Sequence, residues 1–492
     1  MSTRGTIADL DDRPDSLLIA GAWRRARDGR TSAVVSPVEG VRTARVAVAG
    51  PEDLRDAVDA ARRAFDEGPW PRMPGRERAQ ILYDAADLVE EETGRLAWCQ
   101  AVEMGKPVHF GERDDAPFAA MALRFFAALA SQGPGFGRRA NPSVAKTASR
   151  EPLGVVAALS EFHHPLAMAA ALVSPALAMG NTVVLRPSAA APLSVLEFVG
   201  LCARAGLPPG VLNVLTGGRE VAEALVAQQG VDLAAYVGGP YLGRAVAMSG
   251  ARAGVPVELD VGRPAVHIVF EDACLDHSAR QVARALLPGR AEFRATGIRV
   301  LVHEALYRRF ADRLVTLAEE LAPADPRQPA TRLGPLVGQE ERDRLESYLN
   351  WSRQHGARLL PGPSEADHGL YRSLQFLEDS TCAMALRLPE VLAPLAFVTP
   401  FGTQEQAVGL ANTVLGMQNC SVYTADIARA HVVADSVRSV ICRISTCGDA
   451  PGESPSWFDD EDADESGPLR EFDIETAFPF TRSKSVWVDV PL

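Results

Sequence analysis

The sequence lacks any apolar run long enough to span a bilayer. Its two most apolar windows are interrupted, FAAMALRFFAALA by Arg124 and LAMAAALVSPALAMG by Pro175. Neither reaches the roughly 20 residues that a membrane-spanning helix needs. The opening stretch, MSTRGTIADLDDRPD, carries acidic residues early and has no apolar core, so it does not resemble a secretory signal. These absences predict a protein that neither crosses a membrane nor is secreted.

Cysteine pairs with the spacing of metal ligands are also missing. No CxxC motif and no Cys/His cluster occurs, which argues against a zinc site or a disulfide framework. We therefore expect a reduced, cytoplasmic protein without a metal. The seven cysteines are scattered along the chain: Cys99, Cys202, Cys274, Cys382, Cys420, Cys442 and Cys447.

An excess of basic residues is absent as well. The chain has 50 basic and 63 acidic residues, a net charge of −13, which makes nucleic acid or an anionic membrane an unsuitable main partner. Its 492 residues are too many for one hydrophobic core, so two or three domains are expected. A composition of 47% apolar and 23% charged residues is ordinary for a globular protein.

Two amphipathic helices are predicted before the first clear strand, over residues 52–67 and 76–98, because their apolar residues recur at helical spacing. From residue 153 onward, short apolar runs alternate with helical segments, which is typical of a doubly wound parallel sheet. The expected strands there are 153–159, 182–188, 211–217 and 233–239, and the expected helices are 165–179, 192–205, 219–228 and 241–250.

A second α/β series follows. Strands are expected at 265–270, 299–303, 356–362, 397–402 and 421–426, with helices at 305–321 and 339–355 and a last strand at 483–490. The segment 448–470 differs, because six of the seven residues 459–465 are acidic. Low hydrophobicity and like charge predict a mobile surface loop there. Docking of a basic partner is an alternative role for it. No internal repeats are found.

Several long phrases occur in an order typical of one family. They include REPLGVVAAL, HPLAMAAALVSPALAMGNTVVLRPS, AGLPPGVLNVLTGG, GVPVELDVGRPAVHIVFEDACLD, RLGPLVGQEERDRL, LPEVLAPLAFVTPF and ETAFPFTRSKSVWV. With these phrases the chain resembles the aldehyde dehydrogenase superfamily, as a divergent member, from about residue 17 to 445 and again over 475–490.

The resemblance implies an α/β architecture of two doubly wound, Rossmann-type domains plus a small β segment for bridging and oligomerisation. The dinucleotide-binding-type domain would comprise residues 1–128 and 149–257, and the catalytic-type domain residues 258–447. The bridging segment would comprise 129–148 and 471–492, with 448–470 as the acidic loop. A homodimer or homotetramer is expected. In the family's reaction a thiolate attacks an aldehyde, the adduct passes hydride to nicotinamide, and a carboxylate activates the water that releases the acid.

The nucleophile position of the resemblance falls on Arg294, within AEFRATGIRVLVH. Counting back from Arg299-Val300 places the family's cysteine there. A guanidinium has no lone pair at neutral pH and cannot form the covalent adduct, so the usual route is closed. A migrated nucleophile such as Cys447 is the alternative.

The resemblance places the general base on Glu258, in VELDVGRP, and the oxyanion donor on His163, in Phe162-His163-His164-Pro165. The family has asparagine at the position of His163. An imidazole can donate a hydrogen bond and also transfer protons, although a histidine that has drifted in a relaxed site fits equally well. Glu258 and Arg294 could form a salt bridge, which would hold Glu258 ionised and weaken it as a base.

The cofactor site implied by the resemblance is half preserved. In Arg186-Pro187-Ser188-Ala189 the family's ribose-binding lysine has become arginine, and its glutamate has become Ala189, which cannot accept a hydrogen bond. Loss of this carboxylate would remove the usual preference for NAD and tolerate a 2′-phosphate beside Arg186. NAD or NADP is the candidate cofactor, with binding weakened or lost. The candidate binding residues are Arg186, Ser188, Gly217, Gly238, Gly243 and Glu390.

Three functions are consistent with these changes. The first is a repurposed enzyme in which Glu258, His163 and Arg294 perform non-covalent acid–base chemistry on a small molecule. The second is a catalytically dead homologue that acts as a binding or scaffold subunit. The third is a nicotinamide-dependent oxidoreductase of unusual mechanism. Standard aldehyde oxidation is the least favoured function, because the changes gather at the site while scaffold phrases such as GNTVVLRPS persist.

Overall fold

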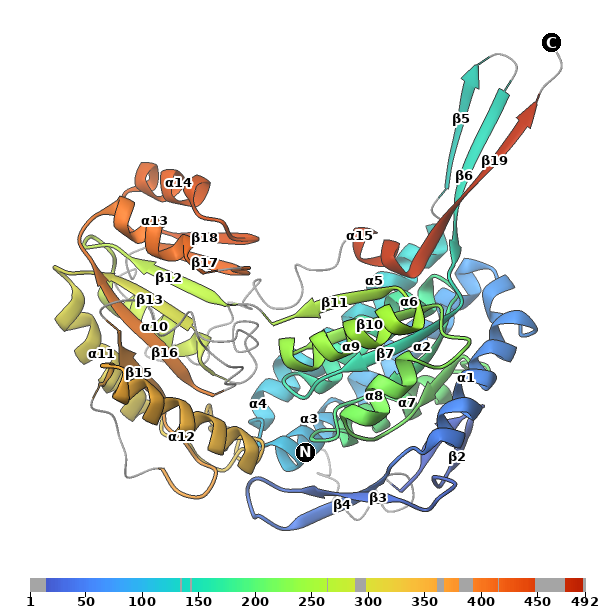
Figure 1. The fold of residues 1–492 in the computed structure, drawn as a ribbon, viewed down its shortest axis with the longest axis horizontal. Helices are drawn as coiled ribbons and strands as arrows, with labels where there is room; N and C mark the ends of the chain where they lie inside the picture. Colours follow the sequence, from blue (N-terminus) through green and yellow to red (C-terminus); the bar gives the residue numbers. More distant parts are fainter. Residues whose placement is uncertain are drawn as a thin grey trace.

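The computed structural model describes residues 15–132, 135–141, 144–262, 264–287, 298–360, 367–379, 393–414, 416–446 and 474–489. They form two α/β lobes and a projecting β arm (Figure 1). The lobes are in contact where the Val108 amide donates to the Pro326 carbonyl at 2.8 Å. No helix of these ranges has both the length and the apolar character needed to cross a membrane.

The N-terminal lobe is built on a seven-stranded sheet of order β11-β10-β7-β8-β9-β1-β2. Five of its strands are parallel, and β1 pairs antiparallel with both β9 and β2. The strands are β1 (Leu17–Ile19), β2 (Ala22–Arg24), β7 (Val155–Ser160), β8 (Thr182–Arg186), β9 (Leu212–Val214), β10 (Leu233–Gly238) and β11 (Val257–Val261). The sheet is therefore mixed, because its edge pair β1–β2 runs against the parallel core.

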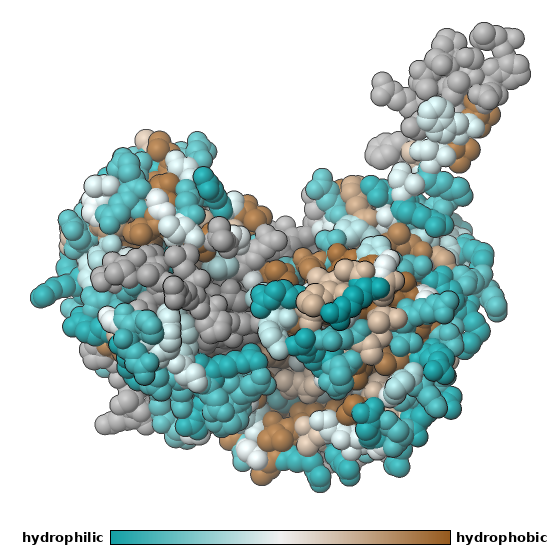
Figure 2. Space-filling model, viewed as in Figure 1, coloured by the Kyte–Doolittle hydropathy of each residue, from teal (hydrophilic) through white to brown (hydrophobic). Residues whose placement is uncertain are grey.

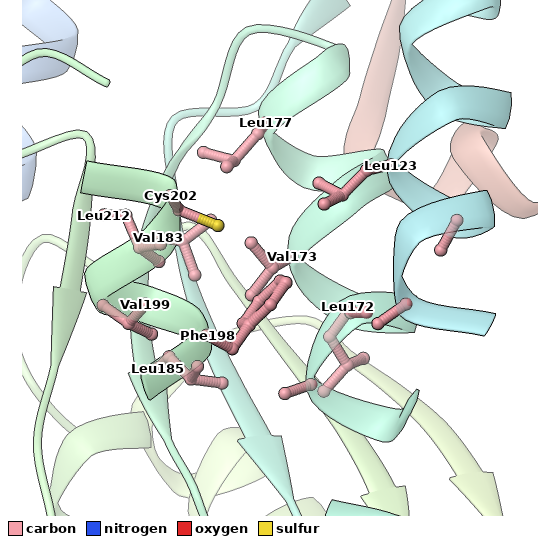
Figure 3. Close-up of a cluster of buried hydrophobic side chains, with 14 of the residues drawn as sticks. Leu123, Leu172, Val173, Leu177, Val183, Leu185, Phe198, Val199, Cys202 and Leu212 are labelled. Atoms are coloured by element: carbon pink, nitrogen blue, oxygen red, sulfur yellow. The ribbon is translucent and has the colours of Figure 1, made fainter. Parts of the chain in front are cut away.

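The alternation of side chains along these strands divides the core between two faces. Val156 and Val183 pack in one hydrophobic cluster, and their neighbours Val155 and Val184 pack in the other. The first cluster is covered by α2 (Gly75–Glu91), α5 (Ala116–Gln132), α6 (Pro165–Ala178) and α7 (Leu193–Arg204), and the second by α1 (Pro51–Asp66), α8 (Arg219–Val226) and α9 (Pro240–Ala253). Figure 3 shows the first cluster, with Phe198 of α7 between β8 and α6.

The C-terminal lobe has a second seven-stranded sheet, of order β14-β15-β16-β13-β12-β17-β18. All its pairs are parallel except β14–β15. The strands are β12 (Ala265–Val269), β13 (Ile298–His303), β14 (Arg358–Leu359), β15 (Gln375–Glu378), β16 (Leu395–Phe401), β17 (Asn419–Tyr423) and β18 (Ile441–Ser445). Its helices are α10 (Leu275–Ala285), α11 (Tyr307–Glu320), α12 (Gln339–Gln354), α13 (Gln404–Asn412) and α14 (Ile427–Ser436).

The arm is a three-stranded antiparallel sheet of order β19-β6-β5 that extends away from the lobes (Figure 1). It consists of β5 (Gly135–Asn141), β6 (Val144–Pro152) and β19 (Thr481–Asp489), which follows the short helix α15 (Ile474–Ala477). The pairing joins segments that lie far apart in the sequence, such as Lys484 opposite Ser149. Domain boundaries between arm and lobes stay a prediction.

Most expected elements are present within one to three residues of their expected bounds, but the N-terminal region differs. The helix expected over 76–98 is two helices, α2 and α3 (Thr93–Met104), separated at Glu92, where φ is −98° and ψ is 13°. Thr93 and Gly94 are weak helix formers, which favours a break there. The hairpin β3 (Thr31–Val35) and β4 (Arg42–Ala47), like β1 and β2, was not predicted.

Candidate functional site

The carboxyl ends of β7, β8, β9 and β10 meet at one edge of the N-terminal sheet. Four residues lie at or just beyond these ends: Glu161, Arg186, Gly217 and Gly238. In open α/β sheets ligands bind beyond the carboxyl ends of the strands, where helix N-termini also point. This edge is therefore the candidate site for a dinucleotide.

Arg186 ends β8 and is only 3% exposed. Its Nε donates to the Gly217 carbonyl at 3.0 Å, and its Nη1 lies 4.0 Å from Glu161 Oε1. Nη1 makes no hydrogen bond within the described part of the chain. Burial lowers the pKa of Arg186, and Glu161, Tyr236 and Glu220 oppose that shift. The guanidinium is thus held in place by one bond and keeps a donor for a ligand.

Glycine is required at positions 217 and 238, both by the backbone conformation and by the close approach of neighbouring side chains. Their φ angles are +151° and +159°, which side-chain-bearing residues rarely adopt. A Cβ at Gly217 would lie 2.4 Å from Val221 Cγ2, and one at Gly238 would lie 2.1 Å from Glu161 Cγ. The chain can therefore turn tightly into α8 and α9 at this edge, where a pyrophosphate would approach their N-termini.

Ser188 and Gly243, two further candidate binding residues, have local structural roles. The Ser188 hydroxyl accepts from the Ala190 amide at 3.3 Å and is buried. Gly243 lies within α9, where a Cβ would come within 2.7 Å of Val261 Cγ1 on β11. This placement indicates helix–sheet packing for Gly243, and its role toward a cofactor stays a prediction.

His163 and His164 follow β7 and precede α6. His163 is 2% exposed and its ring stacks on Phe162, with centroids 4.3 Å apart. His164 Nδ1 lies 3.0 Å from Asp115 Oδ1 and 3.1 Å from Lys106 Nζ. Lys106 Nζ and Asp115 Oδ1 are themselves 2.6 Å apart, and both side chains are buried. A buried charged group thus anchors the segment that carries His163.

Glu258 lies on the edge strand β11, opposite Ala235 of β10, which in turn pairs with Ala158 of β7. Its side chain is exposed, and no ion pair or hydrogen bond with another described residue holds it. The register places Glu258 two strands away from β7, the strand that precedes His163, so strand pairing alone does not bring the two together. Glu258 is nevertheless accessible to a ligand.

Two candidate residues lie outside the described residues, namely Arg294 and Glu390, and so does the acidic loop 448–470. The expected salt bridge between Glu258 and Arg294 therefore stays a prediction. Cys382 and Cys447 also lie outside the described residues.

The described cysteines all belong to core elements or to the start of a helix. Cys99 lies in α3, Cys202 in α7, Cys274 before α10, Cys420 in β17 and Cys442 in β18. Burial raises the pKa of Cys99 and raises that of Cys202 to about 12, so both thiols stay protonated. A hydrogen bond with Cys442 raises the pKa of Cys420 and lowers that of Cys442. Within these ranges no cluster of His, Cys, Asp or Glu could hold a metal ion.

Comparison with known proteins identifies the family. The model of the aldehyde dehydrogenase family matches residues 23–455. The chain belongs to the aldehyde dehydrogenase family. This family member is 30% identical over 442 residues to aldehyde dehydrogenase 1 of Tanacetum cinerariifolium, covering 88% of this chain and 89% of that protein.

Solved structures of the family share the whole fold. An indole-3-acetaldehyde dehydrogenase in complex with NAD⁺ matches with a TM-score of 0.88 at 28% identity, covering 99% of this chain and 100% of that one. A variant of an aldehyde dehydrogenase from Bacillus cereus matches with a TM-score of 0.90 at 27% identity, covering 100% of both chains. The aldehyde dehydrogenase fold, with two mixed α/β sheets, is thus confirmed, and structural relatives bind NAD⁺.

Three residues at or near the site were not predicted from the sequence: Glu161, Lys106 and Asp115. Glu161 directly follows the buried strand β7, whose residues are apolar up to Leu159, and this position alone was a signal for a group at the sheet edge. Lys106 and Asp115 lie far from the strand ends in sequence, on either side of α4 (Val108–Phe110). Only the packing of the fold brings them to His164.

Proposed function

We propose that this aldehyde dehydrogenase family member performs non-covalent acid–base chemistry on a small molecule instead of aldehyde oxidation through a thioester. Glu258, His163 and Arg294 would be its functional groups. The observation that carries the proposal is the thiol inventory: Arg294 occupies the nucleophile position of the resemblance, and the described cysteines belong to α3, α7, β17, β18 and the start of α10.

The roles follow from the chemistry of each group. Glu258, which is exposed and has no described ion-pair partner, would remove a proton from carbon beside a substrate carbonyl. The Arg294 guanidinium would donate to the oxygen that gains negative charge, and His163 would return a proton to the product. An isomerisation or cyclisation balances with these steps, because the proton that leaves carbon is replaced and no electrons leave the substrate. In a dehydration the proton from His163 would go to the leaving hydroxyl, which departs as water.

We further propose that NAD or NADP binds at the edge formed by β7, β8, β9 and β10, more weakly than in relatives that keep the ribose carboxylate. The free Nη1 donor of buried Arg186 and the glycine turns at Gly217 and Gly238 support this. When bound, such a cofactor would supply a hydride acceptor. The residues present here would bind its ribose and pyrophosphate, and Glu390, by resemblance, its nicotinamide ribose.

A second candidate function, a binding or scaffold subunit, is favoured by the exposed apolar arm. Val486, Trp487 and Val488 of β19 are 44%, 63% and 52% exposed. Figure 2 shows apolar residues on this arm. We propose that the arm forms the contact between subunits of a homodimer or homotetramer, because association would bury the exposed apolar side chains of its edge strand. The buried thiols of Cys99 and Cys202, which stay protonated, support a reduced, cytoplasmic setting.

Restoring the thiol tests the catalytic part. We expect the wild-type chain to oxidise no aldehyde and the Arg294→Cys variant to form NADH from NAD and an aldehyde, because the other site groups would then meet a nucleophile. NADH absorbance and acid product measure this. Arg294→Ala, which removes the guanidinium without adding a thiol, is the matched control. Aldehyde oxidation by the wild-type chain above the protein-free blank would contradict the proposal.

A further inference from the structure

Glu161 brings a carboxylate to the dinucleotide edge at a place where no role has been assigned to it. It follows β7, and its amide donates to the Val237 carbonyl at 3.1 Å, so its position is set by the sheet. Its side chain packs directly against Gly238: a Cβ added to Gly238 would lie 2.1 Å from Glu161 Cγ. From there Oε1 faces Arg186 Nη1 at 4.0 Å.

We propose that Glu161 selects the cofactor at this site, replacing the ribose carboxylate that Ala189 lacks and favouring the free 2′-hydroxyl of NAD over the 2′-phosphate of NADP. This inference rests on the proposed cofactor site. It reverses the expectation that loss of the carboxylate at Ala189 leaves room for a 2′-phosphate beside Arg186.

The hydrogen-bonding groups match a hydroxyl. A ribose hydroxyl is both a donor and an acceptor, so it can donate to the Glu161 carboxylate and accept from Arg186. Arg186 Nη1 is buried and has no acceptor within the described ranges, and thus it offers a donor next to a carboxylate. Hydrogen bonds that involve an ionised group are the stronger ones, so this pair fixes the ribose well.

The charges oppose a phosphate. Arg186 supplies a single positive charge. Burial lowers its pKa, and the nearby carboxylates of Glu161 and Glu220 already oppose that shift. A 2′-phosphate would add a further negative group beside Glu161, at a site where low exposure reduces screening by solvent. A phosphate bound by the guanidinium would lie against the Glu161 carboxylate, whose Oε1 is 4.0 Å from Arg186 Nη1. Like charges in contact disfavour the wrong ligand, which is how a site gains specificity.

Calorimetric titration with NAD and with NADP tests this in the full chain, its Glu161→Gln variant and a control, Glu223→Gln. The amide in Glu161→Gln keeps the shape of the side chain and removes its charge. Glu223 is also a carboxylate near this edge, on α8, but its partner is Arg219. We expect wild type and the control to prefer NAD. We expect Glu161→Gln to lose about 10-fold in NAD affinity, the size of one charged hydrogen bond, and to gain affinity for NADP.

The outcomes separate the two proposals. NAD binding with the same NAD/NADP ratio in wild type and Glu161→Gln would overturn the role of Glu161 and leave the cofactor site standing. An equal loss of affinity for both cofactors would assign Glu161 a structural role only and would also overturn it. Binding of neither cofactor by folded wild type would overturn both proposals. Circular dichroism shows whether each variant is folded.

Discussion

At the scale of single residues, Asp115 holds together a group of buried polar side chains. Lys106 and His164 both contact its Oδ1, at 2.6 Å and 3.0 Å, and all three side chains are at most 3% exposed. Burial raises the pKa of Asp115, but Lys106 and His164 together lower it by more, so its pKa falls from 3.8 to about 2. The segment that carries His163 therefore depends on an ionised carboxylate.

Replacing Asp115 with asparagine should destabilise the N-terminal lobe by about 3–5 kcal/mol, because it leaves the buried Lys106 ammonium without its counter-charge. Denaturant unfolding followed by circular dichroism measures this. His164→Phe is the matched control: it replaces one buried ring by another and leaves the Lys106–Asp115 pair, so its cost should be about 1.5–3 kcal/mol, the size of one hydrogen bond to a charged group. A smaller loss in Asp115→Asn than in His164→Phe would contradict the account.

The pH dependence of that difference has a definite sign. A carboxyl whose pKa is lowered on folding contributes stability above its unfolded pKa, and this contribution is lost as the pH falls through the folded value. For Asp115 the window runs from 3.8 down to about 2. The gap in unfolding free energy between wild type and Asp115→Asn should therefore narrow across that window and stay constant above it.

Only some of the candidate site residues could be proposed from the sequence. Glu258, His163 and Arg294 could be proposed from the sequence because they stand inside long ordered phrases, and their roles stay a prediction. Glu161 was not proposed, because its partner Arg186 lies on the neighbouring strand, and only strand pairing brings the two together. Whether a carboxylate stands beside a given cation depends on such non-local pairing.

At the scale of elements, α7 begins at an unusual cap. Glu103, at the end of α3, accepts from the Leu193 amide at 2.5 Å, the Ser194 amide at 3.1 Å and the Ser194 hydroxyl at 2.7 Å. Burial raises the pKa of Glu103 to about 7, although these three donors oppose the shift. A side chain from another helix thus satisfies the first amides of α7, which its own sequence leaves without a cap.

Glu103→Gln should cost about 1–3 kcal/mol, because one carboxylate oxygen becomes an amide nitrogen whose hydrogens face a backbone N–H. The measurement is denaturant unfolding at a pH above 7, where Glu103 is ionised. Ser194→Ala removes the hydroxyl donor but keeps both backbone bonds, and should cost less. If Ser194→Ala proved the more harmful change, the backbone cap would not be the main contribution of Glu103.

Elements of the two parallel cores were predictable, because buried parallel strands are short and almost wholly apolar. β7 and β10 are buried at every residue. The strands β1–β4 were not. β2 and β3 are mostly solvent-exposed or half-buried, and β1 is buried and apolar but only three residues long. Their pairing is decided by contacts with β9 and with each other.

At the scale of the whole molecule, β19 carries the exposed apolar residues Val486, Trp487 and Val488 on the projecting arm. Trp487→Asp should shift the protein from a dimer or tetramer to a smaller species, because a charge would be buried in the contact. Sedimentation velocity measures this. Lys484→Gln, on the same strand, is the control and should leave the assembly unchanged. A monomeric wild type would contradict the proposed assembly.

The overall architecture, two α/β sheets in an aldehyde dehydrogenase fold, followed from the order of family phrases. The contacts between lobes did not. Arg327 pairs with Glu39 at 2.5 Å across 288 positions, and Gly105 lies against Pro335, so a Cβ there would meet Pro335 Cγ at 2.7 Å. Such contacts depend on the final placement of the lobes and leave no local pattern in the sequence.

The proposed function requires that this family member has no thiolate route to aldehyde oxidation. The most direct measurement incubates the wild-type protein with NAD and a panel of aldehydes and follows NADH, before and after alkylation of its thiols with iodoacetamide. The account predicts no NADH above the protein-free blank in either case. NADH formation that alkylation abolishes would contradict it, because a cysteine would then replace the nucleophile that Arg294 cannot provide.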